Sequence, residues 1–257
     1  MSDAGRSVVM VENPDGAGSF VIVCDHASNR IPAEYQSFEF ANDALQTHIA
    51  WDPGALPVAR HLSATLDAPL LWPDVSRLVI DCNRDLDVRS LIVTESDGRP
   101  VPANVGLSDD ERSRRIEHVH TRYHAAIDAC IKRRTASGRA MTLIAIHSYT
   151  PVYLGKSRPW QIGIVFGEDR RMADLLIGEL KSDPSLEVGI NEPYSPADQV
   201  YYTVERHSGP LGLPAAMIEI RNDEIGDDAG QRGWADRLAN ILVAAEPRLM
   251  QAKHAAA

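Results

Sequence analysis

The chain has 257 residues, of which 44% are hydrophobic and 24% are charged, and its formal net charge is −10. This length suits one α/β domain with a substantial core, and no Pro/Gly-rich linker divides it, so we expect a single domain over residues 1–257. The acidic balance argues against a nucleic-acid partner, whose phosphates require a basic face. It does not exclude a small anionic substrate, because a few arginines can set the potential inside a cleft.

Membrane and secretory features are also missing from the sequence. No segment approaches the roughly 18 consecutive apolar residues that a bilayer span requires, and residues 1–13 lack the pattern of a signal peptide. Cys24, Cys82 and Cys130 are few and unpatterned, which favours core thiols in a reducing compartment over a disulfide framework. We therefore expect a cytoplasmic protein without a membrane partner, as a monomer or a homodimer.

Short apolar runs rich in β-branched residues predict strands that are buried on both faces. These runs cover residues 19–24, 70–72, 78–80, 141–146, 162–166 and 215–220. Apolar residues at three- and four-residue spacing predict helices between them. The helices cover residues 42–66 with a break at Pro53, 108–134, 170–180 and 229–250. The alternation predicts an α/β fold whose mixed, mainly parallel sheet is covered by helices on both faces.

Polar clusters follow several of the predicted strands. In sheets of this kind, ligands bind beyond the carboxyl ends of the strands. The clusters are residues 25–26, 81–84, 147–148 and 219–221. Their convergence on one edge of the sheet predicts a single active site. No Gly-x-Ser-x-Gly motif is present, which argues against a serine hydrolase with a nucleophile elbow.

His26 and His147 each follow or end an apolar strand. One histidine at a strand end is more often structural, but two at the same sheet edge favour metal ligation, and imidazole is a preferred ligand of zinc. A catalytic zinc site needs three protein ligands and an open position, so a third ligand is required. We prefer Asp52, which a Pro-Gly turn follows, although its spacing suits a turn residue equally well. The candidates weighed for this position are Asp25, Asn29, His48 and Asp52.

Basic residues flank the predicted strand at 78–80, with Arg77 before it and Asn83 and Arg84 after it. A guanidinium group matches a carboxylate in its planar geometry, and a neighbouring amide can fix orientation. These residues are candidates for binding a substrate carboxylate. A structural pairing of Arg84 with Asp81 explains its presence equally well.

Glu219 ends the last predicted strand, at the same sheet edge as the two histidines. Hydrolysis of an amide at zinc needs a base that takes a proton from water and returns it to the leaving nitrogen, and one Glu can do both. Arg221 lies two residues on, where it can bind substrate or pair with Glu219. His207 lies in an aromatic-rich polar segment that either covers the site, as a substrate-binding residue, or forms a surface loop.

A family resemblance adds to these observations. Residues 24–32, Cys-Asp-His-Ala-Ser-Asn-Arg-Ile-Pro, resemble the opening motif of the N-formylglutamate amidohydrolase family, in its Asp-His-Ala-Ser-Asn branch. Further matching blocks follow in the expected order, so the resemblance covers nearly the whole chain from residue 18. They are residues 48–55, 76–84, 123–124, 147–151, 191–194 and 219–221.

The resemblance implies a three-layer α/β/α fold similar to zinc-dependent exopeptidases and to aspartoacylase-like deacylases. It implies one zinc ion on His26, His147 and a carboxylate, and Glu219 as the general base. It also implies that Asn83 and Arg84 bind the substrate carboxylate, and that Arg77 polarises the scissile carbonyl or binds substrate. Carboxypeptidase-like proteins have Glu where Asn29 stands here, so the third ligand is assigned to Asp52.

We accordingly expect a zinc-dependent amidohydrolase that cleaves an N-formyl or short N-acyl group from an acidic amino acid such as N-formyl-L-glutamate. One alternative is a metallopeptidase or amidase that acts on a carboxylate-bearing peptide or a cell-wall fragment. Another is a metal- or amino-acid-binding protein without catalysis. A small closed pocket favours N-formyl amino acids, whereas an open groove favours peptides.

Overall fold

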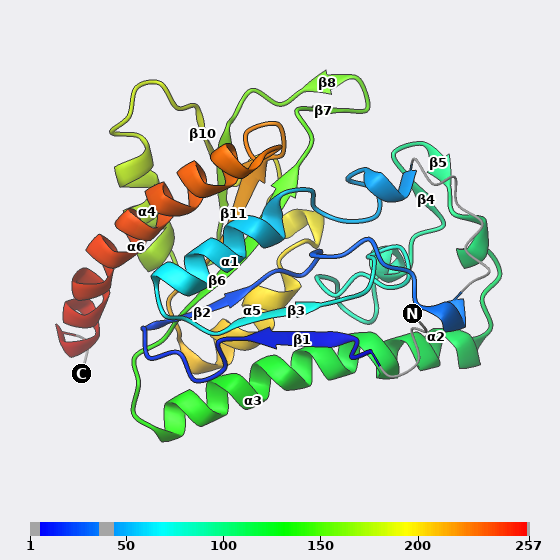
Figure 1. Ribbon diagram of the computed structural model, residues 1–257, viewed down its shortest axis with the longest axis horizontal. Helices are drawn as coiled ribbons and strands as arrows, with labels where there is room; N and C mark the ends of the chain where they lie inside the picture. Colours follow the sequence, from blue (N-terminus) through cyan, green and yellow to red (C-terminus); the bar gives the residue numbers. More distant parts are fainter. Residues whose placement is uncertain (1–5, 36–43, 256–257) are drawn as a thin grey trace.

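The computed structural model of the protein describes residues 6–35 and 44–255. Within these ranges, seven strands form one sheet in the order β1-β3-β2-β6-β11-β9-β10 (Figure 1). The strands are β1 (Val9–Glu12), β2 (Phe20–Val23), β3 (Leu70–Pro73), β6 (Thr142–Tyr149), β9 (Ile162–Val165), β10 (Val188–Ile190) and β11 (Ala215–Arg221). The central strands β3, β2, β6 and β11 are parallel, whereas β1 and β9 run antiparallel to their neighbours β3 and β11.

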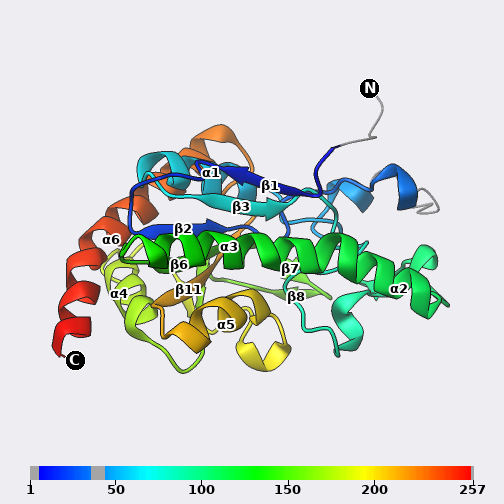
Figure 2. The same ribbon diagram turned by 90° about the horizontal axis from the view of Figure 1, so that it is seen from below.

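Helices cover both faces of the sheet. On one face α1 (Ala55–Thr65) and α4 (Arg171–Leu180) pack against α6 (Asp228–Ala255). On the other face α3 (Arg122–Ala136) runs along the strands, as Figure 2 shows, and contacts α5 (Tyr202–Ser208). Each face has its own buried apolar cluster, because side chains of a strand point alternately to the two sides. The predicted α/β class with a mixed, mainly parallel sheet in a three-layer arrangement is confirmed.

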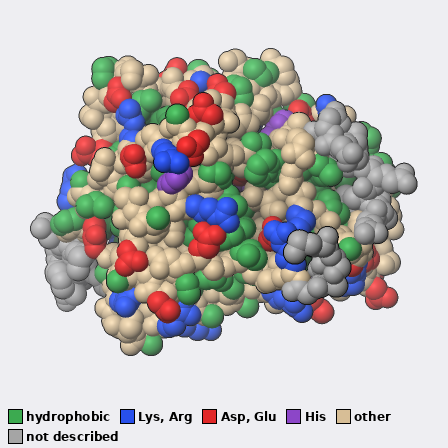
Figure 3. All heavy atoms as spheres, viewed as in Figure 1, with side chains coloured by type: hydrophobic (Ala, Val, Ile, Leu, Met, Phe, Trp, Pro, Cys, Tyr) green, Lys and Arg blue, Asp and Glu red, His purple; other side chains and the backbone are tan. Residues whose placement is uncertain are grey.

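Two short hairpins project beyond the sheet. They are β4 (Glu95–Ser96) with β5 (Arg99–Pro100), and β7 (Val152–Tyr153) with β8 (Lys156–Ser157). On the face seen in Figure 3, the described residues intersperse acidic and basic side chains, so no continuous basic surface forms there. No helix within the described part of the chain has both the length and the apolar character of a bilayer span.

The prediction of a strand at residues 78–80 is wrong. This buried run forms a turn, in which the backbone N–H of Val79 donates to the carbonyl of Ser76 at 2.9 Å. Side chains take the place of a neighbouring strand, because Asn104 Nδ2 donates to the carbonyl of Leu78 and Arg115 Nη1 donates to the carbonyl of Val79. Buried carbonyls need a hydrogen-bond partner but not a backbone one, which the apolar pattern alone does not reveal.

The predicted helices differ from the structure mainly at their ends. The helix predicted at 108–134 consists of α2 (Asp109–Arg115), a π-helical segment η5 (Ile116–Thr121) and α3. Of the helix predicted at 42–66, residues 42–43 lie outside the described residues, and α1 begins only after Pro53. The edge strands β1 and β10 were not predicted, since at 4 and 3 residues they are too short to give a clear apolar pattern.

Gly163 in β9 permits a close approach that shapes the site. It lies opposite Glu219 in the antiparallel pairing of β9 with β11. A Cβ atom at this position would lie 1.9 Å from the backbone carbonyl oxygen of Glu192. Only glycine therefore allows the segment after β10 to cross β9 at this point.

Gly163→Ala is expected to lower the free energy of unfolding by roughly 2–4 kcal/mol, because the obstructing atom is backbone and cannot rotate away. Gly178→Ala is the matched control. Gly178 is an exposed position of α4 where an added Cβ atom would meet open space, so alanine should stabilise the protein by about 0.5–1 kcal/mol. Urea unfolding of both variants measures the two changes in the free energy of unfolding. A Gly163→Ala protein as stable as the wild type would contradict the requirement for glycine at this position.

Candidate active site

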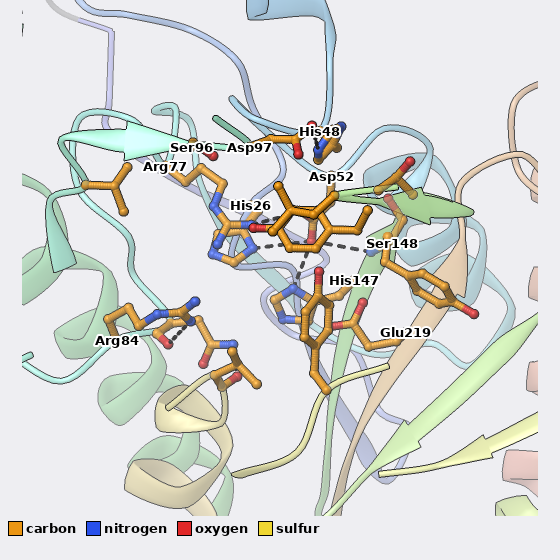
Figure 4. A pocket seen from close by; sticks show the side chains of 18 of the residues that line it. His26, His48, Asp52, Arg77, Arg84, Ser96, Asp97, His147, Ser148 and Glu219 are labelled. Carbon is orange, nitrogen blue, oxygen red and sulfur yellow. Dashed lines mark hydrogen bonds and ion pairs between the residues drawn. The ribbon is translucent and has the colours of Figure 1, made fainter. Parts of the chain in front are cut away.

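A cavity of about 350 Å³ opens at the carboxyl ends of the central strands. His26 follows β2, and His147 and Glu219 lie within β6 and β11 as direct neighbours in the parallel register. The two projecting hairpins form part of its wall, with Asp97 from β4–β5 and Tyr153 from β7 among the lining residues. The position agrees with the convergence of polar clusters that the sequence predicted, and Figure 4 shows the labelled side chains facing this space.

His26, Asp52 and His147 are buried together at the base of the cavity. Asp52 Oδ2 lies 3.3 Å from His26 Nδ1 and 2.9 Å from His147 Nδ1, and the backbone N–H of Ser148 donates to the same oxygen at 3.3 Å. One ligand atom from each of the three side chains lies within 4.8 Å of the others. They form the one such cluster of potential metal ligands among the described residues (Figure 4).

Two further carboxylates hold the far sides of the histidine rings. His26 Nε2 lies 2.7 Å from Asp81 Oδ1, and His147 Nε2 lies 2.9 Å from Asp25 Oδ2. Burial opposes protonation of both rings, but the carboxylates outweigh it: the pKa of His26 rises, and that of His147 rises well above its usual value. Because both nitrogens of each ring face a carboxylate oxygen, the surrounding protein atoms favour the form of each ring that carries a proton on both nitrogens.

This arrangement fits a divalent cation. Asp25 and Asp81 take one N–H from each ring and direct the other nitrogen, Nδ1, toward Asp52, as outer carboxylates do in metal sites. Removing both Nδ1 protons leaves two neutral imidazoles and a carboxylate facing one point, which is a donor set that zinc and related ions favour. A divalent ion replaces the charge of the two protons it displaces.

The other candidates for the third ligand have different partners. Asp25 contacts the outer nitrogen of His147, and its second oxygen accepts hydrogen bonds from Tyr123 and Thr203 at 2.8 Å each. Asn29 Nδ2 donates to the carbonyl of Leu45. His48 Nε2 faces Asp97 Oδ2 at 3.4 Å, on the wall of the cavity.

Glu219 supplies a carboxyl group with an unusual environment. It is 4% exposed, and its Oε2 atom has no hydrogen-bond partner among the described residues. Burial raises the pKa of Glu219 to about 7, and protonated His147 opposes this rise while Asp52 adds to it. A buried carboxyl group without a partner is costly for the fold, and such groups cluster where chemistry requires them.

The three predicted basic and amide residues line the same cavity. Arg77 Nη2 donates to Asp81 Oδ2 at 2.7 Å, and its Nη1 lies 3.5 Å from Asp52 Oδ1. Arg84 donates through Nε to Ser90 Oγ and through Nη1 to the carbonyl of Asn83, while its Nη2 makes no hydrogen bond to any described residue. Asp81 Oδ2 pairs closely with Arg77 at 2.7 Å and more loosely with Arg84, whose Nη1 lies 3.9 Å away.

Arg221 and His207, the other two predicted substrate-binding residues, do not line the cavity. Arg221 pairs with Asp223 and Glu224, and its Nη1 donates to the carbonyl of Pro159 at 2.8 Å. His207 is buried on α5, where it pairs with Asp128 of α3. Arg221 follows the buried part of β11, and so its side chain turns to the loop before β9 instead of the histidines.

An aromatic wall was not predicted from the sequence. Tyr149, Tyr153 and Tyr194 line the cavity, and the guanidinium carbon of Arg158 lies 5.7, 4.6 and 4.8 Å from their ring centroids. These distances allow cation–π contacts to all three rings. Tyr149 and Tyr194 belong to the motif blocks noted in the sequence, but nothing in the spacing indicated that one arginine holds them together.

Binding of a divalent ion is expected to release protons, because the Nδ1 atoms of both histidine rings must be unprotonated to bind it, and Glu219, whose pKa is about 7, adds a further fraction near neutral pH. Because both histidine pKa values are raised, protons compete with the metal below those values, and metal affinity increases as pH rises. Calorimetric titration of metal-free protein with zinc, in buffers of different ionisation enthalpy, counts the protons. Zinc binding that releases no protons and whose affinity does not change with pH would contradict the assignment of His26, Asp52 and His147 as the metal ligands.

Comparison with known proteins identifies the family of the chain. The model of the N-formylglutamate amidohydrolase family matches residues 18–226. The solved structure of gene product Atu2144 from Agrobacterium tumefaciens is 38% identical, with a TM-score of 0.94 over 97% of this chain and 99% of that one. N-formylglutamate amidohydrolase from Ralstonia eutropha JMP134 is 20% identical and shares the fold, with a TM-score of 0.67 over 94% and 98% of the two chains. No curated protein matches by sequence. The chain belongs to the N-formylglutamate amidohydrolase family.

Proposed function

We propose that the protein is a zinc-dependent amidohydrolase that removes a formyl or other short acyl group from an acidic amino acid such as N-formyl-L-glutamate. The observation that carries this proposal is the buried, unpartnered carboxyl group of Glu219 beside the His26–Asp52–His147 cluster. Family membership supports the same reaction. A base next to a metal-binding cluster is the pair of groups that amide hydrolysis at a metal needs.

His26, Asp52 and His147 would hold the zinc ion, which when bound would supply a Lewis acid for the water and the amide carbonyl. Glu219 accepts the proton of the attacking water while the new C–O bond forms. Glu219 then donates this proton to the leaving nitrogen as the C–N bond breaks. For an N-formyl substrate the products are formate and the free amino acid.

Substrate binding is assigned to the basic side of the cavity. Arg84 is 12% exposed, and its Nη2 makes no hydrogen bond to any described residue, which suits it to donate to a substrate carboxylate. Asn83 supports it, since its amide is held by the carbonyl of Val200 and the N–H of Thr203. Arg77 lies beside Asp52, where its positive charge stabilises the oxyanion that develops from the carbonyl. Arg221 and His207 have no substrate-binding role in this proposal.

The buried cysteines bear on the cellular setting of the protein. The three cysteines are buried and free, which suits a reducing compartment such as the cytoplasm. We propose that residues 1–257 act as one domain, as a monomer or a homodimer, on a small anionic N-acyl amino acid, without nucleic-acid or membrane partners.

Formate release from N-formyl-L-glutamate tests the proposal, with metal-free protein measured before and after addition of zinc. N-formyl-L-aspartate and N-acetyl-L-glutamate serve as comparison substrates. Zinc-dependent release from any of the three supports the reaction class, and the preferred one identifies the acyl group and the side chain. Absence of release from all three, in protein that binds zinc, would refute the proposed substrate class.

Glu219→Gln is expected to lower kcat by roughly 10²–10⁴-fold, because the amide cannot accept the proton of water. Zinc content should stay unchanged, since Glu219 is not one of the three clustered ligands. Glu95→Gln, which removes the same charge at the wall of the cavity, should keep kcat within a few-fold of the wild type. Near-normal turnover of Glu219→Gln would exclude it as the base.

A further inference from the structure

A second group of histidines lies behind the segment that carries Asn83 and Arg84. His124 of α3 and His207 of α5 are 1% and 2% exposed, and their rings are stacked with centroids 5.1 Å apart. His124 Nε2 lies 2.9 Å from the carbonyl oxygen of Cys82, and its Nδ1 lies 2.9 Å from His207 Nε2. His207 Nδ1 lies 3.0 Å from Asp128 Oδ1. The chain of contacts thus leads from a partly exposed carboxylate to the backbone next to Asn83.

These contacts require a definite number of protons. A carbonyl oxygen and a carboxylate only accept hydrogen bonds, so His124 Nε2 and His207 Nδ1 must both carry a proton. The contact between the two rings needs one proton more. The three hydrogen bonds therefore use three protons, whereas two neutral imidazoles carry only two.

The third proton places one positive charge on the histidine pair. Asp128 lies at the surface side of the pair, with a side chain that is 41% exposed and with Arg206 Nη2 at 4.0 Å from its second oxygen. In its fully bonded form the pair of His124 and His207 is therefore a single cation. It faces Asp128 on one side and the carbonyl of Cys82 on the other.

The same helix fixes the other end of this segment. His120 Nε2 lies 3.0 Å from the carbonyl oxygen of Arg84, and the rings of His120 and His124 lie 4.4 Å apart. Imidazoles thus hold the carbonyls of Cys82 and Arg84, the residues on either side of Asn83. Together with the bonds of Asn83 to Val200 and Thr203, these contacts support the backbone that carries Arg84 into the cavity.

We propose that His124 and His207 are positioning residues for the Asn83–Arg84 segment, and that they hold it most firmly as a singly charged, three-proton pair that Asp128 stabilises. The inference rests on the proposed function, in which Arg84 binds the substrate carboxylate. The cation also adds a positive charge behind this anion-binding side of the cavity.

The charge depends on pH in a defined direction. Burial lowers the pKa of both rings. The groups that face them are Asp128 on α3, Arg206 on α5, His120 on η5 and Asp25 after β2. Asp128 and Asp25 favour the cation, whereas Arg206 and a charged His120 oppose it. The third proton is therefore bound at low pH and is lost as pH rises, and affinity for a carboxylate ligand should fall with it.

Binding of glutarate to the zinc-loaded protein tests the proposal at about pH 6 and about pH 8. Asp128→Asn removes the carboxylate that stabilises the cation, and it is expected to weaken glutarate binding roughly threefold to tenfold at the lower pH and little at the higher pH. Glu205→Gln is the matched control, because it removes the same charge from the same surface beside Asp128. It should bind glutarate like the wild type at both pH values.

NMR of ¹⁵N-histidine-labelled protein reads the protons directly, with His124→Asn and His207→Asn used to assign the signals. We expect the wild-type pair to take up one extra proton on acidification, and Asp128→Asn to move this uptake to lower pH. Equal glutarate affinity of Asp128→Asn and Glu205→Gln at about pH 6, or two rings that stay neutral there, would overturn the proposal. Glutarate binding that fails in the wild type would instead overturn the role of Arg84 in the proposed function, and the positioning role with it.

Discussion

One carboxylate oxygen, Oδ2 of Asp52, joins the parts of the chain that make the site. It contacts Nδ1 of His26, which lies in the loop after β2, and Nδ1 of His147, which lies within β6. Asp52 itself comes from the turn before α1, so three separate segments meet at one atom. Buried charges are tolerated only when they are paired, and here Asp25, Asp81 and Arg77 complete the pairing. The cluster is therefore part of the core as well as the chemical centre of the molecule.

The sheet supplies the remaining geometry. Parallel pairing of β6 with β11 places Glu219 next to His147, and antiparallel pairing with β9 places Gly163 on its other side. The small residue lets the segment that carries Tyr194 cross the sheet close to Glu219. The position of Glu219, the proposed base, next to the His26–Asp52–His147 cluster thus follows from strand register, which is among the most rigid relations in a protein.

Support for the cavity comes from residues that never reach it. Arg221 holds the backbone at Pro159, beside Arg158 and the tyrosine wall, and His207 stands behind the segment of Arg84. Both were predicted from the sequence to bind substrate. A polar residue near a motif gives the same sequence pattern whether its side chain faces the ligand or packs behind the residues that do. Only the directions of their side chains separate these two roles.

The sequence by itself determined the fold class, the family and the meeting of His26, His147 and Glu219 at one sheet edge, because apolar runs, strand ends and ordered motif blocks are local features. It did not determine the turn at residues 78–80, whose burial resembles that of a strand while its carbonyls are held by Asn104 and Arg115. Nor did it determine which carboxylate meets which ring nitrogen. Asp25, Asp52 and Asp81 are chemically equivalent in the chain, and their partners lie 26 to 122 residues away. Tertiary structure decided these pairings, because loop paths and helix packing set the side-chain directions over such separations.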